Sequence, residues 1–70
     1  MKRQFSTSEI STIRSLVREK SHAGRDRQKA IRAQLRAIGF DISSYALTYQ
    51  AFTTVDLDRL IEAGTIKVVD

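Results

Sequence analysis

The 70-residue sequence contains no cysteine, a single histidine, three glycines and no long apolar run. Without cysteine the chain has no disulfide, no thiolate metal site and no cysteine nucleophile. Because small secreted domains usually depend on disulfides, we expect a reducing compartment. The residues after Met1-Lys2-Arg3 are polar where a secretion signal would be apolar, and no stretch is long enough to span a membrane. These absences predict a cytoplasmic protein without a membrane partner.

Few residues suit catalysis or metal binding. The one histidine, His22, lies in a predicted break between helices, and no strand-turn-helix nucleophile motif accompanies the serines. Zinc sites usually need three or four Cys, His or carboxylate ligands, and we interpret the neighbouring Asp58 and Glu62 as solvated surface. The isolated glycines at 24, 39 and 64 form no phosphate-binding loop. We therefore predict a binding module and not an enzyme, with no cofactor, no metal and no evident small-molecule substrate.

The composition, with 41% hydrophobic and 29% charged residues, is typical of a folded globular chain. Its length leaves room for one core, so residues 1–70 are expected to form one small domain. A core this small gives marginal stability, which burial in a dimer would increase. The expected core residues are Phe5, Ile10, Ile13, Leu16, Val17, Ile31, Leu35, Ile38, Phe40, Ile42, Leu47, Phe52, Leu57, Leu60, Ile61, Ile66 and Val68.

The first predicted helix, residues 7–21, has a well-marked start. Ser6 is the expected N-cap, and Glu9 three residues later completes a capping box. Phe5 before the cap is placed to pack on Ile10. The aliphatic residues from Ile10 to Val17 follow the spacing of one helical face.

Two more helices follow, at 25–38 and 54–63. The break at 21–24 contains Gly24, which we expect to end the first helix in a left-handed conformation, and Gly39 and Gly64 stop the later helices in the same way. Thr53 and Asp56 repeat the capping box in a weaker form, because aspartate is the shorter partner.

Two short segments alternate as strands do. Phe40–Ile42 is weak evidence, whereas Thr65–Val69 is rich in β-branched residues and indicates a terminal strand. We expect these two to pair, although pairing of the terminal strand with a second copy is an alternative. For the segment 43–51 the sequence allows either a short helical turn or an irregular loop. The predicted fold is mainly α with minor β: a compact three-helix bundle with a short two-stranded ribbon or a C-terminal strand.

The net charge of +4 hides an asymmetry. Residues 1–38 carry ten basic and three acidic residues, a net charge of +7, whereas residues 39–70 carry two basic and five acidic residues, a net charge of −3. At 100° per residue, four basic side chains of the second helix lie within about 60° of arc, centred roughly 130° from its apolar line. These four are Arg25, Lys29, Arg32 and Arg36, and Arg14 and Arg18 of the first helix are expected to assist them.

Nucleic acid is the first partner that this pattern indicates, because Lys and Arg on one helical face can follow a phosphate backbone. A helix-turn-helix reader is disfavoured, since the third helix presents Asp56, Asp58 and Glu62, which repel phosphate. If DNA is bound, Arg27, Gln28 and Gln34 are available for polar contacts. A stacking platform of Tyr45, Tyr49, Phe40 and Phe52 is a weaker interpretation.

Protein interaction is the alternative function. A small core, an exposed terminal strand and oppositely charged halves favour association with another protein or with a second copy of the chain, with no nucleic-acid role.

Overall fold

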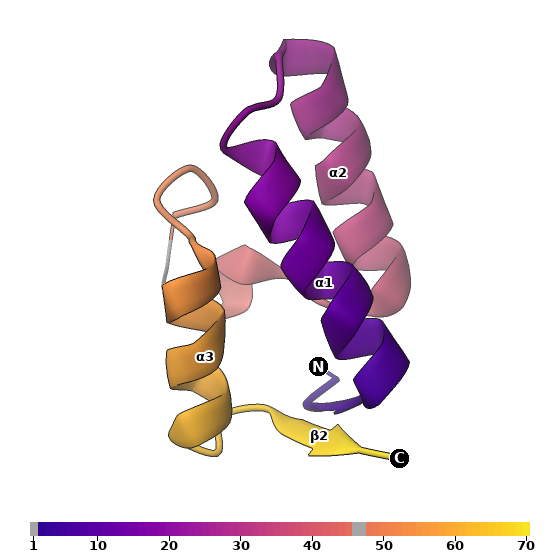
Figure 1. Cartoon of the computed structure of the whole chain (residues 1–70), viewed down its shortest axis with the longest axis vertical. Helices are drawn as coiled ribbons and strands as arrows, with labels where there is room; N and C mark the ends of the chain where they lie inside the picture. The colour runs from indigo at the N-terminus through magenta and orange to yellow at the C-terminus, as the bar shows by residue number, and fades with distance from the viewer. Residues whose placement is uncertain (1, 46–47) are drawn as a thin grey trace.

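The computed structural model describes residues 2–45 and 48–70. These residues form a mainly α-helical fold with a minor two-stranded sheet, as the sequence predicts. Figure 1 shows α1 and α2 as an antiparallel hairpin, with α3 beside α1 and the sheet at the end of the molecule that holds both chain termini. The elements in chain order are β1 (Gln4–Ser6), α1 (Thr7–Lys20), α2 (Arg25–Ile38), the 3-10 helix η1 (Ile42–Tyr45), α3 (Thr54–Glu62) and β2 (Lys67–Val69).

The predicted capping box at the start of α1 is confirmed. The Glu9 N–H donates to the Ser6 hydroxyl oxygen at 3.1 Å, and the Ser6 N–H donates to the Glu9 carboxylate at 2.9 Å. Phe5 and Ile10, on either side of this cap, are both buried in the core. Since an N-cap has an extended backbone, Ser6 is at once the last residue of β1 and the cap of α1.

The bounds of α2 agree with the prediction, but the role of Gly24 does not. Gly39 has φ of 100° and ends α2 in the left-handed region, and the Phe40 N–H returns to the Leu35 carbonyl at 2.9 Å. Gly24 has φ of −73° and is the N-cap of α2, so the expectation that it ends α1 in a left-handed conformation is wrong. The preceding helix stops four residues earlier, at Lys20.

The third helix begins with the predicted second box and is one residue shorter than expected. The Asp56 carboxylate accepts from the Thr53 N–H at 3.0 Å and from the Thr53 hydroxyl at 3.2 Å. Gly64, with φ of 75°, turns the chain from α3 toward β2.

The terminal strand is present, but its predicted partner is wrong. β2 pairs with β1 in parallel, with Phe5 opposite Val68. The expected partner, Phe40–Ile42, instead leads into η1, because the Asp41 carboxylate accepts from both the N–H and the hydroxyl of Ser43 and so stabilises a turn. Of the two alternatives for the segment 43–51, a short helical turn is therefore present at its start, in η1. Ala46 and Leu47 lie outside the described residues.

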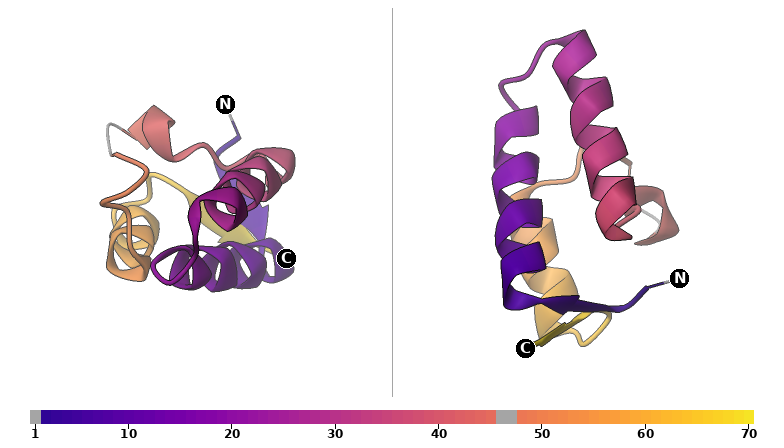
Figure 2. Two further views of the ribbon diagram at one scale, coloured as in Figure 1. Left: turned by 90° about the horizontal axis from the view of Figure 1, so that it is seen from above. Right: turned by 90° about the vertical axis from the view of Figure 1, so that its right-hand side faces the viewer.

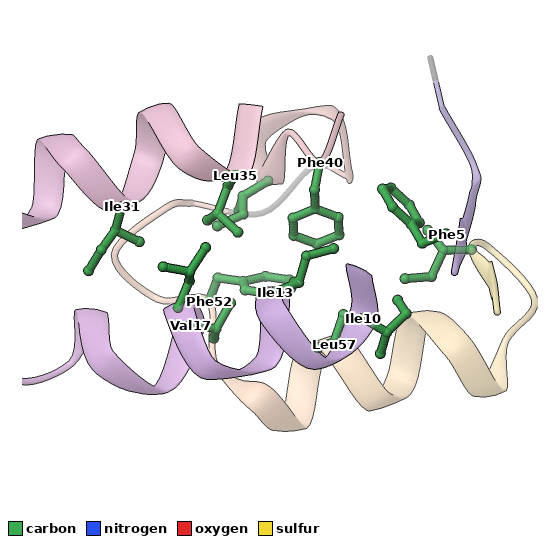
Figure 3. Packing of buried hydrophobic residues seen from close by; sticks show 12 residues of the cluster. Phe5, Ile10, Ile13, Val17, Ile31, Leu35, Phe40, Phe52 and Leu57 are labelled. Atoms are coloured by element: carbon green, nitrogen blue, oxygen red, sulfur yellow. The ribbon is translucent and has the colours of Figure 1, made fainter. Parts of the chain in front are cut away.

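The core lies between α1, α2 and α3 (Figures 2 and 3). Phe40 is at its centre: its ring lies 5.8 Å from that of Phe5, 5.5 Å from that of Tyr45 and 5.7 Å from that of Phe52. Of the expected core residues, Ile38, Leu60 and Ile61 are only partly buried. Val68 is exposed, as are all three residues of β2. The expected residue Leu47 is not among those described. The others are buried, namely Phe5, Ile10, Ile13, Leu16, Val17, Ile31, Leu35, Phe40, Ile42, Phe52, Leu57 and Ile66.

Candidate nucleic-acid interface

Four basic side chains of α2 form an exposed row along the helix. We call this set, Arg25, Lys29, Arg32 and Arg36, the α2 basic row. All four residues are exposed, and within residues 2–45 and 48–70 no carboxylate lies at ion-pair distance from any of them. From Arg25 to Arg36 there are 11 steps of about 1.5 Å, so the row is about 16 Å long, a distance over which one strand of DNA carries about five phosphates.

Packing of the opposite face of α2 turns this row outward. Ile31 and Leu35 are fully buried against the rest of the core and fix the rotation of the helix (Figure 3). The row lies roughly 130° around the helix from that apolar line, and charged side chains are costly to bury. The predicted outward orientation of the row is therefore what the packing produces.

Arg14 and Arg18 lie elsewhere, although the sequence suggested that they assist the row. Arg14 forms an ion pair of 2.8 Å with Asp58 of α3. Arg18, one turn later, lines a small surface hollow together with Thr53 and Thr54 at the start of α3. These two arginines are thus on the α3 side of α1, while the row is on α2, so they form a separate basic surface.

Two of the three polar side chains expected to contact bases are already engaged. Arg27 pairs with Glu19 of α1 through two nitrogen atoms, one of them Nη2 at 3.0 Å from Oε1. The Gln28 amide donates to the carbonyl of Lys20 at 2.8 Å, which fastens α2 to the end of α1. Gln34 remains exposed. These contacts join residues of different elements, so the sequence pattern does not predict them.

Tyr49 lies against α2 in a position that the sequence pattern does not predict. Its hydroxyl donates to the Gln28 carbonyl at 3.0 Å, and its ring centre lies 5.3 Å from the Arg32 guanidinium and 5.2 Å from the Lys20 ammonium. A cation at this distance from a ring is attracted to its π face. Tyr49 thereby holds the segment before α3 against the middle of the α2 basic row.

The predicted aromatic platform of four rings does not form. Phe40 and Phe52 are completely buried, and Tyr45 stacks on Phe40. Of the four, Tyr49 is the one that lies beside the row. A core this small uses most of its aromatic residues for packing.

Asp41 is a carboxylate whose pKa is affected by two residues of the row. Hydrogen bonding from Ser43 is the main cause that lowers the pKa of Asp41, with smaller contributions from the charges of Arg36 and Arg32. Asp41 is therefore ionised at neutral pH and places a negative charge beside the C-terminal end of the row.

Two surface hollows lie along the row and share Arg32 and Tyr49 as lining residues. The first, of about 280 Å³, is bounded by the C-terminal half of α2, by residues 40–43 and by Thr48 and Tyr49. The second, of about 520 Å³, lies toward the start of α2, where Arg25 and Lys29 line it. The row is thus bordered by concave surface and not by a flat one.

The residues that the sequence offered for catalysis or metal binding lie at the surface or in an ion pair. His22 is exposed in the turn between α1 and α2. Asp58, proposed with Glu62 as surface, is the partner of Arg14. In the described part of the chain no three potential metal ligands come together. Nor does any helix there have the length and apolar character required to cross a bilayer.

Comparisons of this chain with models of protein families, with curated proteins and with solved structures found no match.

Proposed function

We propose that this protein binds the phosphate backbone of nucleic acid through the α2 basic row. The observation that carries the proposal is that four cationic side chains lie exposed on one helix without a carboxylate partner among the described residues. Three other basic residues of the N-terminal half form ion pairs. These pairs are Lys2 with Glu9, Arg14 with Asp58 and Arg27 with Glu19. Charge left unpaired on one face attracts a polyanion.

The positions of Asp56 and Asp58 also favour binding of a polyanion on the α2 side of the molecule. Asp56 is used to cap α3, and Asp58 is paired across the α1–α3 contact. A duplex or single strand approaching the α2 side therefore meets mostly positive charge, with Asp26 in the first turn of α2 and Asp41 after its end as local exceptions. The absence of cysteine favours a reducing compartment such as the cytoplasm for this binding.

Salt dependence gives the first test. Each phosphate contact contributes about −0.9 to the log-log slope of affinity against salt for duplex DNA and about −0.7 for a single strand. Four contacts predict a slope of roughly −3 to −4, measurable by fluorescence anisotropy with labelled oligonucleotides at several salt concentrations. A slope near zero contradicts backbone binding.

Matched charge reversals give the second test. Arg32→Glu with Arg36→Glu lowers the net charge from +4 to 0 on the row, and Arg18→Glu with Arg59→Glu lowers it equally on other surfaces. We expect the first pair to abolish binding and the second to weaken it only modestly. Circular dichroism checks that both variants are folded. Equal losses in the two variants would show that net charge alone drives the association.

Self-association is a second candidate, favoured by the exposure of β2. Val68 and Val69 are 42% and 41% exposed, and the sheet of the described residues has no third strand beyond β2. Exposed edge strands are templates for pairing with another chain. Sedimentation at micromolar concentration tests this: a dimer that Val68→Lys dissociates supports it, and a monomer at all concentrations rejects it.

A further inference from the structure

The smaller of the two hollows beside the α2 basic row has a lining of mixed chemistry. Its lining includes the buried apolar residues Leu35, Phe40 and Ile42. It also includes the polar side chains of Asp41, Ser43 and Thr48. Apolar walls with a few polar groups are typical of sites for small, partly polar molecules.

The charges that line this hollow are of both signs. Arg32 and Arg36 line its α2 side, and the ionised Asp41 also belongs to its lining. The arginines attract phosphates that flank the hollow, while Asp41 offers carboxylate oxygen atoms to hydrogen-bond donors. The Asp41 oxygen atoms accept from Ser43, and a carboxylate has capacity for further donors such as the N–H groups of a nucleobase.

The volume limits what enters. At about 280 Å³ the hollow is just below the range of roughly 300–1,000 Å³ that is usual for small-molecule sites. It is therefore suited to a group no larger than a single nucleoside. A base that is paired and stacked in a duplex is not free to enter, whereas a base of a single strand is.

We infer that this protein prefers single-stranded nucleic acid, with one unpaired base seated in the hollow that α2 forms with residues 40–43, 48 and 49, while the flanking phosphates lie on the α2 basic row. Tyr49, which lines the hollow and is held by Arg32 and Gln28, supplies an aromatic surface beside the base. This inference rests on the proposed backbone binding, and the test below separates the two.

The test compares two labelled strands of equal charge. One is a 12-nucleotide oligothymidylate, and the other is a 12-unit strand with abasic sites throughout, which keeps the phosphates and lacks the bases. Since stacking of one base on an aromatic residue contributes a several-fold to hundredfold gain, we expect the base-bearing strand to bind about tenfold more tightly. A 12-base-pair duplex should show no such gain over the abasic strand beyond its greater charge density.

A variant that fills the hollow localises the effect. Thr48→Met places a flexible apolar chain at the rim, since methionine fills irregular gaps, and Val55→Met makes a comparable change at a residue of α3 that is 57% exposed. We expect Thr48→Met to remove the tenfold difference and leave the affinity for the abasic strand unchanged, and Val55→Met to alter neither. Because the chain has no tryptophan, tyrosine emission gives an independent signal: only the base-bearing strand should quench it.

Each outcome is decisive. If both strands bind equally, the seated base is rejected and backbone binding stands. If the difference persists in Thr48→Met, the bases contact another part of the protein and the hollow is rejected. If neither strand binds, the proposed function fails, and the inference fails with it.

Discussion

The hydroxyl of Tyr49 donates a hydrogen bond of 3.0 Å to the main-chain carbonyl of Gln28. This bond joins a segment without regular structure to the middle of α2, at the helix that carries the basic row. The Lys20 and Arg32 cations close to the ring of Tyr49 add to the attachment. The shape of both hollows beside the row therefore depends on one tyrosine.

Removing the two tyrosine hydroxyls should have opposite consequences. Tyr49→Phe deletes a made hydrogen bond and should lower the free energy of unfolding by about 1 kcal/mol. Tyr45→Phe is the matched control, because the Tyr45 hydroxyl is buried and has no hydrogen-bond partner among the described residues. Its removal should leave stability unchanged or raise it. Urea unfolding followed by circular dichroism measures both, and a larger loss in Tyr45→Phe would contradict this account.

Lys20 should make stability rise with pH in the alkaline range. The residue is only 4% exposed, and burial is the main cause that lowers the pKa of Lys20, partly opposed by Asp56. The unfolded chain then binds more protons at this amine than the folded chain does, so stability increases as the pH rises toward about 10.4, the ordinary lysine value.

Lys20→Met should remove that alkaline rise, because an apolar chain of similar length replaces the buried amine and has no proton to release. Lys29→Met, a change at an exposed lysine of α2, is the control. Unfolding free energies measured between pH 7 and about pH 10 test the pair. If the variant keeps the slope of the unmodified protein, Lys20 is not its source.

Acid should destabilise the fold through two glutamates. The pKa of Glu19 is lowered mainly by hydrogen bonding from Arg27, and that of Glu9 mainly by hydrogen bonding from Lys2. A carboxylate with a depressed folded-state pKa stabilises the fold above its unfolded value, near 4.3, and this stabilisation disappears as the pH falls through the folded-state pKa.

Glu19→Gln should therefore make stability less dependent on pH below about 4.3. Glu62→Gln, at an exposed residue of α3, provides the comparison. Thermal unfolding measured over the acid range distinguishes them. Identical acid profiles for Glu19→Gln and the unmodified protein would remove Glu19 from the explanation.

The glycines should respond to substitution according to their backbone conformation. Gly64 has φ of 75° and open space around its Cα, so Gly64→Ala should cost about 1–2 kcal/mol from the left-handed conformation alone. Gly64→Asn should cost less, since asparagine tolerates this region. Gly24 has an extended N-cap geometry, so Gly24→Asp should stabilise α2 by a few tenths of a kcal/mol. Urea midpoints measure all three, and a destabilised Gly24→Asp would be the contrary result.

Local features were predictable from the sequence. The capping boxes at Ser6 and Thr53, the bounds of α2 and the outward face of its basic row depend on residues within one or two helical turns of each other. The turn at Asp41 was also encoded locally, but its alternation resembled a strand. Three residues provide too few positions to separate the two patterns.

Features that join distant residues were not predictable. The sequence contains many acids, and nothing local indicates that Asp58 lies opposite Arg14 or that Glu19 lies opposite Arg27. The burial of Lys20 and the contact of Tyr49 with α2 likewise depend on elements that meet only in the folded molecule. The sequence therefore predicts the basic face of α2 but does not predict the two hollows beside it.

The parallel pairing of β1 with β2 bears on how the molecule folds. Gln4 and Lys67 lie opposite each other across the sheet, so this contact closes almost the whole chain into one loop and carries a large closure entropy. The α1–α2 hairpin needs only neighbouring residues, so we expect it to form before Phe5 pairs with Val68. The helix that carries the positive charge is thus able to take shape before the two ends of the chain have met.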